Sequence, residues 1–300
     1  MSAPPEHRLK YFSWRYTAIN AGWAVGPLIG VAAGTAFAVL FTTAGIVYAL
    51  FALALNMLSI PAEASAAPAT GRLAQPPVLQ SMAAAVRDPR LAFFVAGGIF
   101  AMAVYGQWSA TLAPYLSTMD GGIEIFAYLV SINGAVVLLG SAITRRCIVR
   151  LGALNALVIG CLLFFAGEIG FLLSTGFLGL AIAMIIFTIG EIFVVPSEYM
   201  LVDGIATASN RGSYFGAHSF AMIGNFFGPA LGGMMLAAFG ASGMFLLFAG
   251  FAAVSALLFT IGTRMPPPRT LADRVQASRA SSAVMERQLV GRAGRLSAIG

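Results

Sequence analysis

The sequence predicts an all-α protein that crosses a lipid bilayer about eight times. Of its 300 residues, 59% are hydrophobic and only 9% are charged, and the mean hydropathy is +0.88. A soluble globular protein is about 45–50% apolar and about 25% charged. So few charged side chains cannot cover a solvated surface, and the composition therefore indicates a polytopic membrane protein.

The second observation is a series of apolar segments. They lie at about residues 17–36, 38–60, 91–116, 124–144, 151–174, 177–200, 213–236 and 241–263. Each is long enough to cross a hydrocarbon core of about 30 Å as a helix. In lipid the backbone must satisfy its own hydrogen bonds, and the alternating pattern of a barrel strand is absent, so we expect helices.

The third observation is that all 17 basic residues fall in connections on one side of these eight segments. Three precede the first segment, three lie between the second and third, three between the fourth and fifth, one between the sixth and seventh, and seven in the tail. The positive-inside rule therefore predicts that both termini are cytoplasmic. The net charge of +6 follows from this topology and from anionic lipid, so no nucleic-acid partner is expected.

Two nearly identical strings occur 202 residues apart, GWAVGPLIG at 22–30 and GNFFGPALG at 224–232. Glycines spaced four residues apart lie along one helix face and let another backbone approach closely. Generic packing explains a single such string, but two copies with Gly-Pro in register indicate equivalent helices of two parallel repeats. The motif residues are Gly22, Gly26, Pro27, Gly30, Gly224, Gly228, Pro229 and Gly232.

These strings resemble the Gly-Pro motif in the fifth helix of the major facilitator superfamily, especially its drug/proton antiporters. Residues 191–233 resemble helix ten, the following loop and helix eleven of the same group. The resemblance covers most of residues 8–263 and implies that the chain corresponds to helices 5–12 of a twelve-helix fold. Four helices would then be encoded upstream, which requires about 110–140 residues.

The resemblance also divides the chain into parts. We expect a cytoplasmic N-terminal segment, the last two helices of the N-terminal half, a cytoplasmic loop between the halves, a six-helix C-terminal half and a basic cytoplasmic tail. These parts are residues 1–16, 17–60, 61–90, 91–263 and 264–300.

One family motif is only partly kept. The basic loop Gly-x-x-x-Asp-Arg-x-Gly-Arg, which recurs weakly between helices eight and nine, reads GSAITRRCIVR here. Gly140 and Arg145 match it, whereas Thr144 stands at the acidic position and Cys147 at the glycine. The motif that implies a gating contact in the family is therefore incomplete in this half.

Ionisable groups inside a span are costly and therefore indicate function. Glu191 is the first candidate for a coupled proton, with a structural carboxyl as the alternative. Glu198 shares its face, because seven residues are nearly two helical turns. For Glu198 and Asp203 the favoured role is pairing with Arg211 near the cytoplasmic surface. His218 could titrate near neutral pH, although a packing role is commoner.

Polar and aromatic residues in the spans are candidates for a substrate cavity. Tyr105, Gln107 and Trp108 offer contacts for an amphipathic organic ligand. Asn133 and Asn225 lie near the middle of their spans, where they either bond a neighbouring helix or line the cavity. For Glu168 we favour a buried structural role.

The sequence thus predicts a secondary transporter that exports small organic molecules in exchange for protons by alternating access. The resemblance places it as a monomer in the bacterial cytoplasmic (inner) membrane. Two cysteines and two histidines, all apart in sequence, give no metal motif, and no cofactor is expected. The alternatives are a truncated fragment that does not transport and, with less support, a polytopic membrane enzyme that uses its carboxylates as acid and base.

Overall fold

A computed structural model describes residues 5–34, 36–57, 87–207 and 210–267. Within these ranges the chain is helical and has no strand. The helices are α1 (Pro5–Ala33), α2 (Phe37–Met57), α4 (Pro89–Ala110), α5 (Leu112–Leu116), α6 (Gly122–Leu151), α7 (Ala153–Leu173), α8 (Phe177–Ile205), α9 (Arg211–His218), the 3₁₀ helix η2 (Ser219–Ile223) and α10 (Gly224–Arg264).

The all-α membrane fold is confirmed. Six stretches of the described residues are long and apolar enough to span a bilayer, and a shorter apolar stretch covers Ala18–Ala33. The last of the six, Arg211–Arg264, has 54 residues and turns back at Gly240, whose φ of 68° is easy for a residue without a side chain. It therefore crosses twice, and together with the short stretch the helices follow the eight predicted segments.

Two boundaries differ from the prediction. Helix α1 begins at Pro5, inside the expected cytoplasmic segment 1–16. Helix α6 continues through the basic stretch 144–150 to Leu151, so the predicted loop is mostly helix and Gly152 alone joins α6 to α7. Most of the predicted loop 61–90 and of the tail 264–300 lies outside the described residues.

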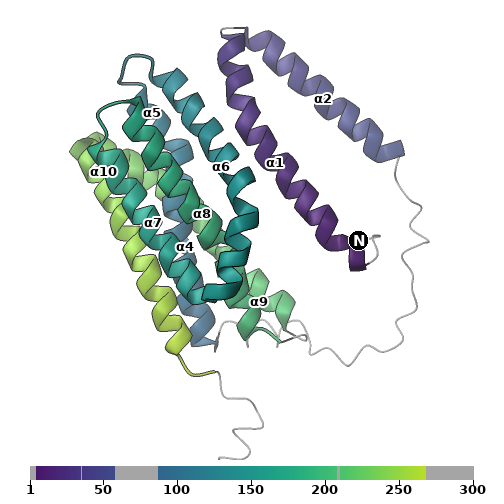
Figure 1. Ribbon diagram of the computed structural model, residues 1–300, viewed down its shortest axis with the longest axis vertical. Helices are drawn as coiled ribbons and strands as arrows, with labels where there is room; N and C mark the ends of the chain where they lie inside the picture. The colour runs from purple at the N-terminus through teal and green to yellow at the C-terminus, as the bar shows by residue number, and fades with distance from the viewer. Residues whose placement is uncertain (1–4, 35, 58–86, 208–209, 268–300) are drawn as a thin grey trace, which may run out of the picture.

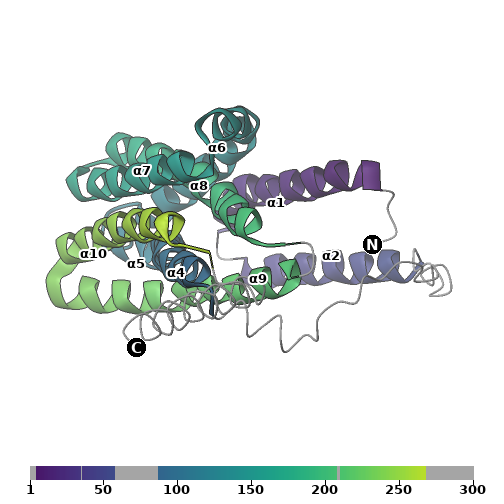
Figure 2. The same ribbon diagram turned by 90° about the horizontal axis from the view of Figure 1, so that it is seen from below.

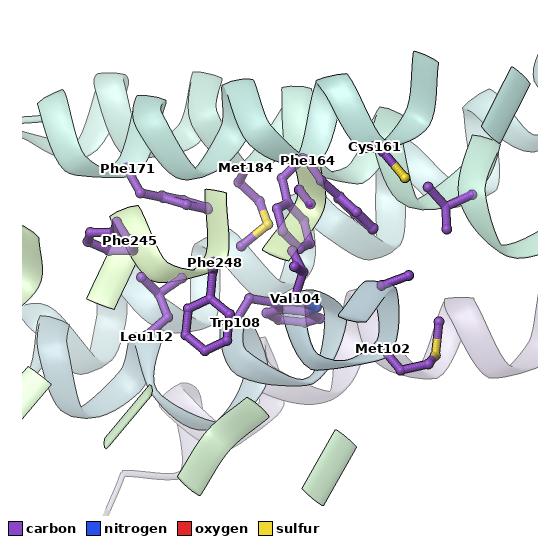
Figure 3. Close-up of a cluster of buried hydrophobic side chains, with 14 of the residues drawn as sticks. Met102, Val104, Trp108, Leu112, Cys161, Phe164, Phe171, Met184, Phe245 and Phe248 are labelled. Carbon is purple, nitrogen blue, oxygen red and sulfur yellow. The ribbon is translucent and has the colours of Figure 1, made fainter. Parts of the chain in front are cut away.

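Helices α4, α7, α8 and α10 supply most of the apolar core. Phe164 and Phe171 of α7 pack with Met184 of α8 and with Phe245 and Phe248 of α10 (Figure 3). Ring contacts join α7 to α10, since the Phe171 and Phe245 centroids are 5.8 Å apart. Burial of large aromatic side chains, each of 150–250 Å² in general, holds α4, α7, α8 and α10 together.

Helix α1 packs on α6, whereas α2 stands apart from the other helices (Figures 1 and 2). A methyl group placed on Gly134 of α6 would lie 2.6 Å from the Ala24 backbone nitrogen, which shows how closely α1 approaches. Almost every described side chain of α2 is exposed. Figure 1 also shows the start of α1, the α6–α7 connection, α9 and the end of α10 at the same end of the molecule, which we call the basic end.

The two Gly-Pro strings differ in their surroundings. In the second copy, a methyl group on Gly228 would lie 2.8 Å from the Ala103 Cα atom of α4, so the two backbones are in close contact. In the first copy, no described atom lies within 4 Å of a methyl group placed on Gly22, Gly26 or Gly30. Among the described residues, only the second string therefore packs its glycines on another helix, which is α4.

Candidate functional site

A cavity of about 280 Å³ lies where α1, α4, α6, α8 and the α9–α10 segment meet. Its lining combines carboxylates, amides, a histidine and aromatic rings, and it contains no Lys or Arg of the described chain. The lining includes Ile19, Asn20, Trp23, Met102, Tyr105, Trp108, Asn133, Glu191, Val195, Glu198, Tyr199, His218, Ser219, Ala221, Met222 and Asn225. Seven of the eight residues predicted for proton coupling or for the cavity are among them.

Glu191 is held by the neighbouring helix. The Asn133 Nδ2 atom of α6 donates to Glu191 Oε2 at 2.8 Å and is 3.0 Å from Thr188 Oγ1. Glu191 is 8% exposed and Asn133 is 4% exposed. The two roles that the sequence left open for Asn133 therefore coincide, because it lines the cavity and bonds between helices.

Glu198 pairs with His218, not with Arg211 as the sequence suggested. Glu198 Oε1 and His218 Nε2 are 2.7 Å apart, and the side chains are only 3% and 7% exposed. Gly98 of α4 makes room for this pair, because a methyl group there would collide with Glu198 Oε1 and lie 2.8 Å from the Ala221 Cβ atom. The pair joins α8 to the end of α9.

Aromatic side chains form one wall of the cavity. Trp108 of α4 meets Trp23 of α1 edge-on, with centroids 6.2 Å apart, and Tyr105 is 6.5 Å from Trp108. Trp108 Nε1 and Asn225 Oδ1 are buried and have no hydrogen-bond partner among the described residues. The wall thus combines an apolar surface with a donor and an acceptor that no described group satisfies.

Gln107 is the predicted cavity residue that does not line the cavity. Its Nε2 atom lies 3.0 and 2.9 Å from the two carboxylate oxygens of Glu168 on α7, and Thr111 Oγ1 donates to Gln107 Oε1 at 2.7 Å. Gln107 and Glu168 are both 0% exposed. Gln107 therefore faces the helix bundle, where it partners the buried carboxyl of Glu168.

The basic end carries two further charged contacts. Asp203 and Arg211 form a salt bridge of 2.6 Å at the surface, as the sequence suggested. Asp88, the N-cap of α4, accepts hydrogen bonds from the Arg90 backbone and side chain and from Tyr214. Burial of the Asp88 carboxyl would raise its pKa, but the Arg90 and Tyr214 hydrogen bonds and the Arg90 charge hold it below the ordinary value of 3.8.

Arg145 is not among the residues that line the cavity. It borders a separate groove of about 350 Å³ between α6 and α8, which is otherwise lined mostly by apolar side chains. Thr144, at the motif's acidic position, donates to the Gly140 carbonyl within the same helix at 2.9 Å. The partial motif therefore forms part of α6, and none of its residues is among those that line the cavity.

Sequence reasoning missed the contribution of α1. Asn20 and Trp23 line the cavity together with Ile19. From the sequence, only the Gly-Pro motif of this helix was predicted to have a role. An asparagine and a tryptophan one turn apart in an apolar helix are a signal that could have found them. Tyr199, next to Glu198, was missed as well.

The described residues contain no group of three or more His, Cys, Asp or Glu side chains that could hold a metal ion.

A helical membrane bundle around a buried polar cavity is an arrangement typical of membrane transporters. The sequence model of the Major Facilitator Superfamily matches residues 1–222, and the chain belongs to this family. Its relatives are transporters and not enzymes.

Among the relatives, the MFS-type transporter YdeE of Escherichia coli, itself uncharacterized, is 30% identical over 267 residues. That match covers 87% of this chain and 66% of YdeE. YqjV of Bacillus subtilis, likewise uncharacterized, is 27% identical over 83% of this chain and 62% of its own length. The chain thus spans a little under two thirds of these relatives.

Two further matches carry functional names. A Na(+), Li(+), K(+)/H(+) antiporter of Planococcus maritimus is 25% identical over 90% of this chain and 69% of its own length. Among solved structures, the peptide transporter POT in complex with alafosfalin is 22% identical with a TM-score of 0.46, covering 77% of this chain and 50% of that one.

Proposed function

We propose that the chain provides the substrate cavity and the proton site of a transporter that exports small amphipathic organic molecules in exchange for protons. The observation that carries this proposal is Glu191, a carboxyl in the cavity wall that receives an amide hydrogen bond from Asn133. No described cation forms a salt bridge with it. Protonation of such a carboxyl changes the charge of the cavity by a full unit, which is the requirement for coupling.

The cavity suits a small organic ligand. Its volume of about 280 Å³ is close to the lower end of the usual range for small-molecule sites, which is about 300–1,000 Å³. Trp23, Tyr105 and Trp108 offer ring faces for an apolar body. Trp108 Nε1 and Asn225 Oδ1 can satisfy an acceptor and a donor of the ligand, because no described residue does so. An amphipathic molecule therefore complements this lining.

The carboxylates divide the coupling into two steps in our proposal. Glu191 and Glu198 are seven residues apart on α8, which places them about 10 Å apart along the helix axis. Glu191 exchanges its proton when substrate binds or leaves the cavity. Glu198, paired with His218 toward the basic end, responds to the cytoplasmic side. Alternating access would then expose the two carboxyls in turn.

The remaining assignments follow from the basic residues. We propose that the basic end faces the cytoplasm of a bacterial cell, with both termini on that side, because positively charged connections are retained there. Apolar side chains on the outer surface of α2 and α6 favour contact with lipid. A monomer is the expected state.

The proposal is tested in inside-out membrane vesicles from cells that express the protein. An acidic interior should drive uptake of amphipathic dyes from a panel of cationic, neutral and anionic probes. Glu191→Gln should abolish this uptake and leave the amount of folded protein unchanged, whereas Tyr128→Phe, on the exposed surface of α6, serves as the matched control. Uptake that survives in Glu191→Gln with its pH dependence intact, or a panel with no transported dye, would overturn the proposal.

A second candidate function is antiport of Na⁺, Li⁺ or K⁺ against protons. It is favoured by the name of the Planococcus maritimus relative and by two carboxylates in a cavity without Lys or Arg. The same vesicles separate the two functions. Addition of NaCl, LiCl or KCl should dissipate the pH gradient if the protein exchanges cations, and should leave it unchanged if the protein exports organic molecules.

A further inference from the structure

We propose that Asp88 and Tyr214 are positioning residues that hold His218 against Glu198. This inference rests on the proposed function, in which the Glu198–His218 pair is part of proton coupling. Neither Asp88 nor Tyr214 is among the residues that line the cavity. Their effect on the site is therefore indirect and passes through helix α9.

Asp88 is a fixed acceptor at the start of α4. Its Oδ1 atom accepts from the Arg90 backbone nitrogen at 2.9 Å and from Arg90 Nε at 3.2 Å, while Arg90 Nη2 is 2.9 Å from Oδ2. The carboxyl is 0% exposed. Because Arg90 bonds both carboxylate oxygens of Asp88, the orientation of this carboxylate does not depend on α9.

Tyr214 is the contact of α9 with this acceptor. Its hydroxyl donates to Asp88 Oδ2 at 2.8 Å, and the ring is buried. Residues 214 and 218 are four apart and therefore lie on the same face of the helix. The face that bonds α4 through Tyr214 thus presents His218 to Glu198 one turn later.

Helix α9 needs such an anchor because it is short. It has eight residues and is followed by the 3₁₀ helix η2, so its hydrogen bonding is not continuous with that of α10. Isolated helices of this length are marginal, and a 3₁₀ stretch within a longer helix often marks a hinge. Two buried polar contacts, one to α4 and one to α8, therefore hold α9 in addition to its exposed Asp203–Arg211 salt bridge with α8.

Helix α4 also contacts the other member of the pair, Glu198. Gly98 lies against the Glu198 carboxylate and against Ala221 of η2, so α4 packs directly on Glu198 and on the segment that follows His218. Tyr199 adds an edge-on ring contact to His218, with centroids 5.6 Å apart. Loss of the Tyr214 hydroxyl should therefore release His218 without moving Glu198.

Nitrogen NMR of the imidazole tests the inference directly. The chain has two histidines, His7 and His218, so His7→Asn leaves His218 as the one ¹⁵N-labelled imidazole in protein reconstituted into lipid nanodiscs. At one fixed pH, Glu198→Gln should move the His218 Nε2 signal, because the carboxylate partner is lost. Tyr214→Phe should move it in the same direction and lower the equilibrium constant for pairing about fivefold, as expected for one ordinary hydrogen bond.

Graded variants separate positioning from general damage. Asp88→Ala should reproduce the effect of Tyr214→Phe, whereas Asp88→Asn, which keeps an acceptor oxygen, should restore much of the wild-type signal. Tyr115→Phe is the matched control, because this tyrosine packs on Phe245 near the opposite end and lines no part of the cavity.

Two results would overturn the inference. Tyr214→Phe and Asp88→Ala could both leave the His218 signal at its wild-type position, or Glu198→Gln could leave it unmoved. The measurement needs no transport, so the outcome is independent of the dye uptake that tests Glu191.

Discussion

Gln107 Nε2 lies 3.0 and 2.9 Å from the two carboxylate oxygens of Glu168, and no part of either side chain is exposed. Gln107→Leu should destabilise the protein by about 2–3 kcal/mol, because it leaves a buried carboxyl without its donor. The free energy of unfolding can be followed by titration with SDS in mixed micelles.

The double variant separates pairing from packing. Gln107→Leu with Glu168→Leu replaces both polar partners with apolar groups and should be less destabilised than Gln107→Leu alone. If the double variant loses as much unfolding free energy as Gln107→Leu and Glu168→Leu lose together, these side chains do not interact directly.

The second Gly-Pro string should be sensitive to a single methyl group. Gly228→Ala would place its Cβ atom 2.8 Å from the Ala103 Cα atom, and overpacking of this kind costs about 1–3 kcal/mol. Thermal unfolding of the purified protein measures the cost. Gly26→Ala is the matched control, since no described atom lies within 4 Å of its new methyl group. An equal loss at Gly26 would show that another helix packs on α1 in the membrane.

Stability in acid should depend on Asp88. The pKa of this carboxyl is lower in the folded protein than its ordinary value of 3.8, so its charged form stabilises the fold. The contribution is fully present above the ordinary value and is lost as the pH falls through the lowered, folded value. Asp88→Asn should remove this part of the pH dependence. The unfolding temperatures of the two proteins should therefore differ most at neutral pH and approach each other as the pH falls below 3.8.

Much of the fold could be predicted because a bilayer demands long apolar helices. The limits of α6 could not, since a run of basic residues is equally compatible with a loop and with a helix that extends beyond the lipid. A helix of 30 residues is about 45 Å long and extends beyond a hydrocarbon core of about 30 Å, so Arg145 and its neighbours can be helical outside the lipid.

The site was predicted less completely because helix rotation is not visible in one sequence. Gln107 and Trp108 are neighbours, yet successive side chains point about 100° apart on a helix, and only Trp108 faces the cavity. The same limit hid the choice of His218 over Arg211 as the partner of Glu198. Glu191 and Asn133 were identified as buried polar groups in separate spans, but their mutual hydrogen bond depends on how α6 and α8 pack.

The orientation of the basic end can be measured by cysteine labelling in intact cells, after Cys147→Ser and Cys161→Ala remove the native thiols. Ser117 and Thr175 are exposed at the opposite end, and Asn155 and Pro266 are exposed near the basic end. If the positive-inside rule holds, Ser117→Cys and Thr175→Cys should react with a membrane-impermeant maleimide from outside, because their connections carry no Lys or Arg. Asn155→Cys and Pro266→Cys should react only after the cells are permeabilised. Total labelling in detergent controls for expression and reactivity at each position. External labelling of Asn155→Cys in sealed cells would reverse the orientation and, with it, the side from which the Glu198–His218 pair is reached.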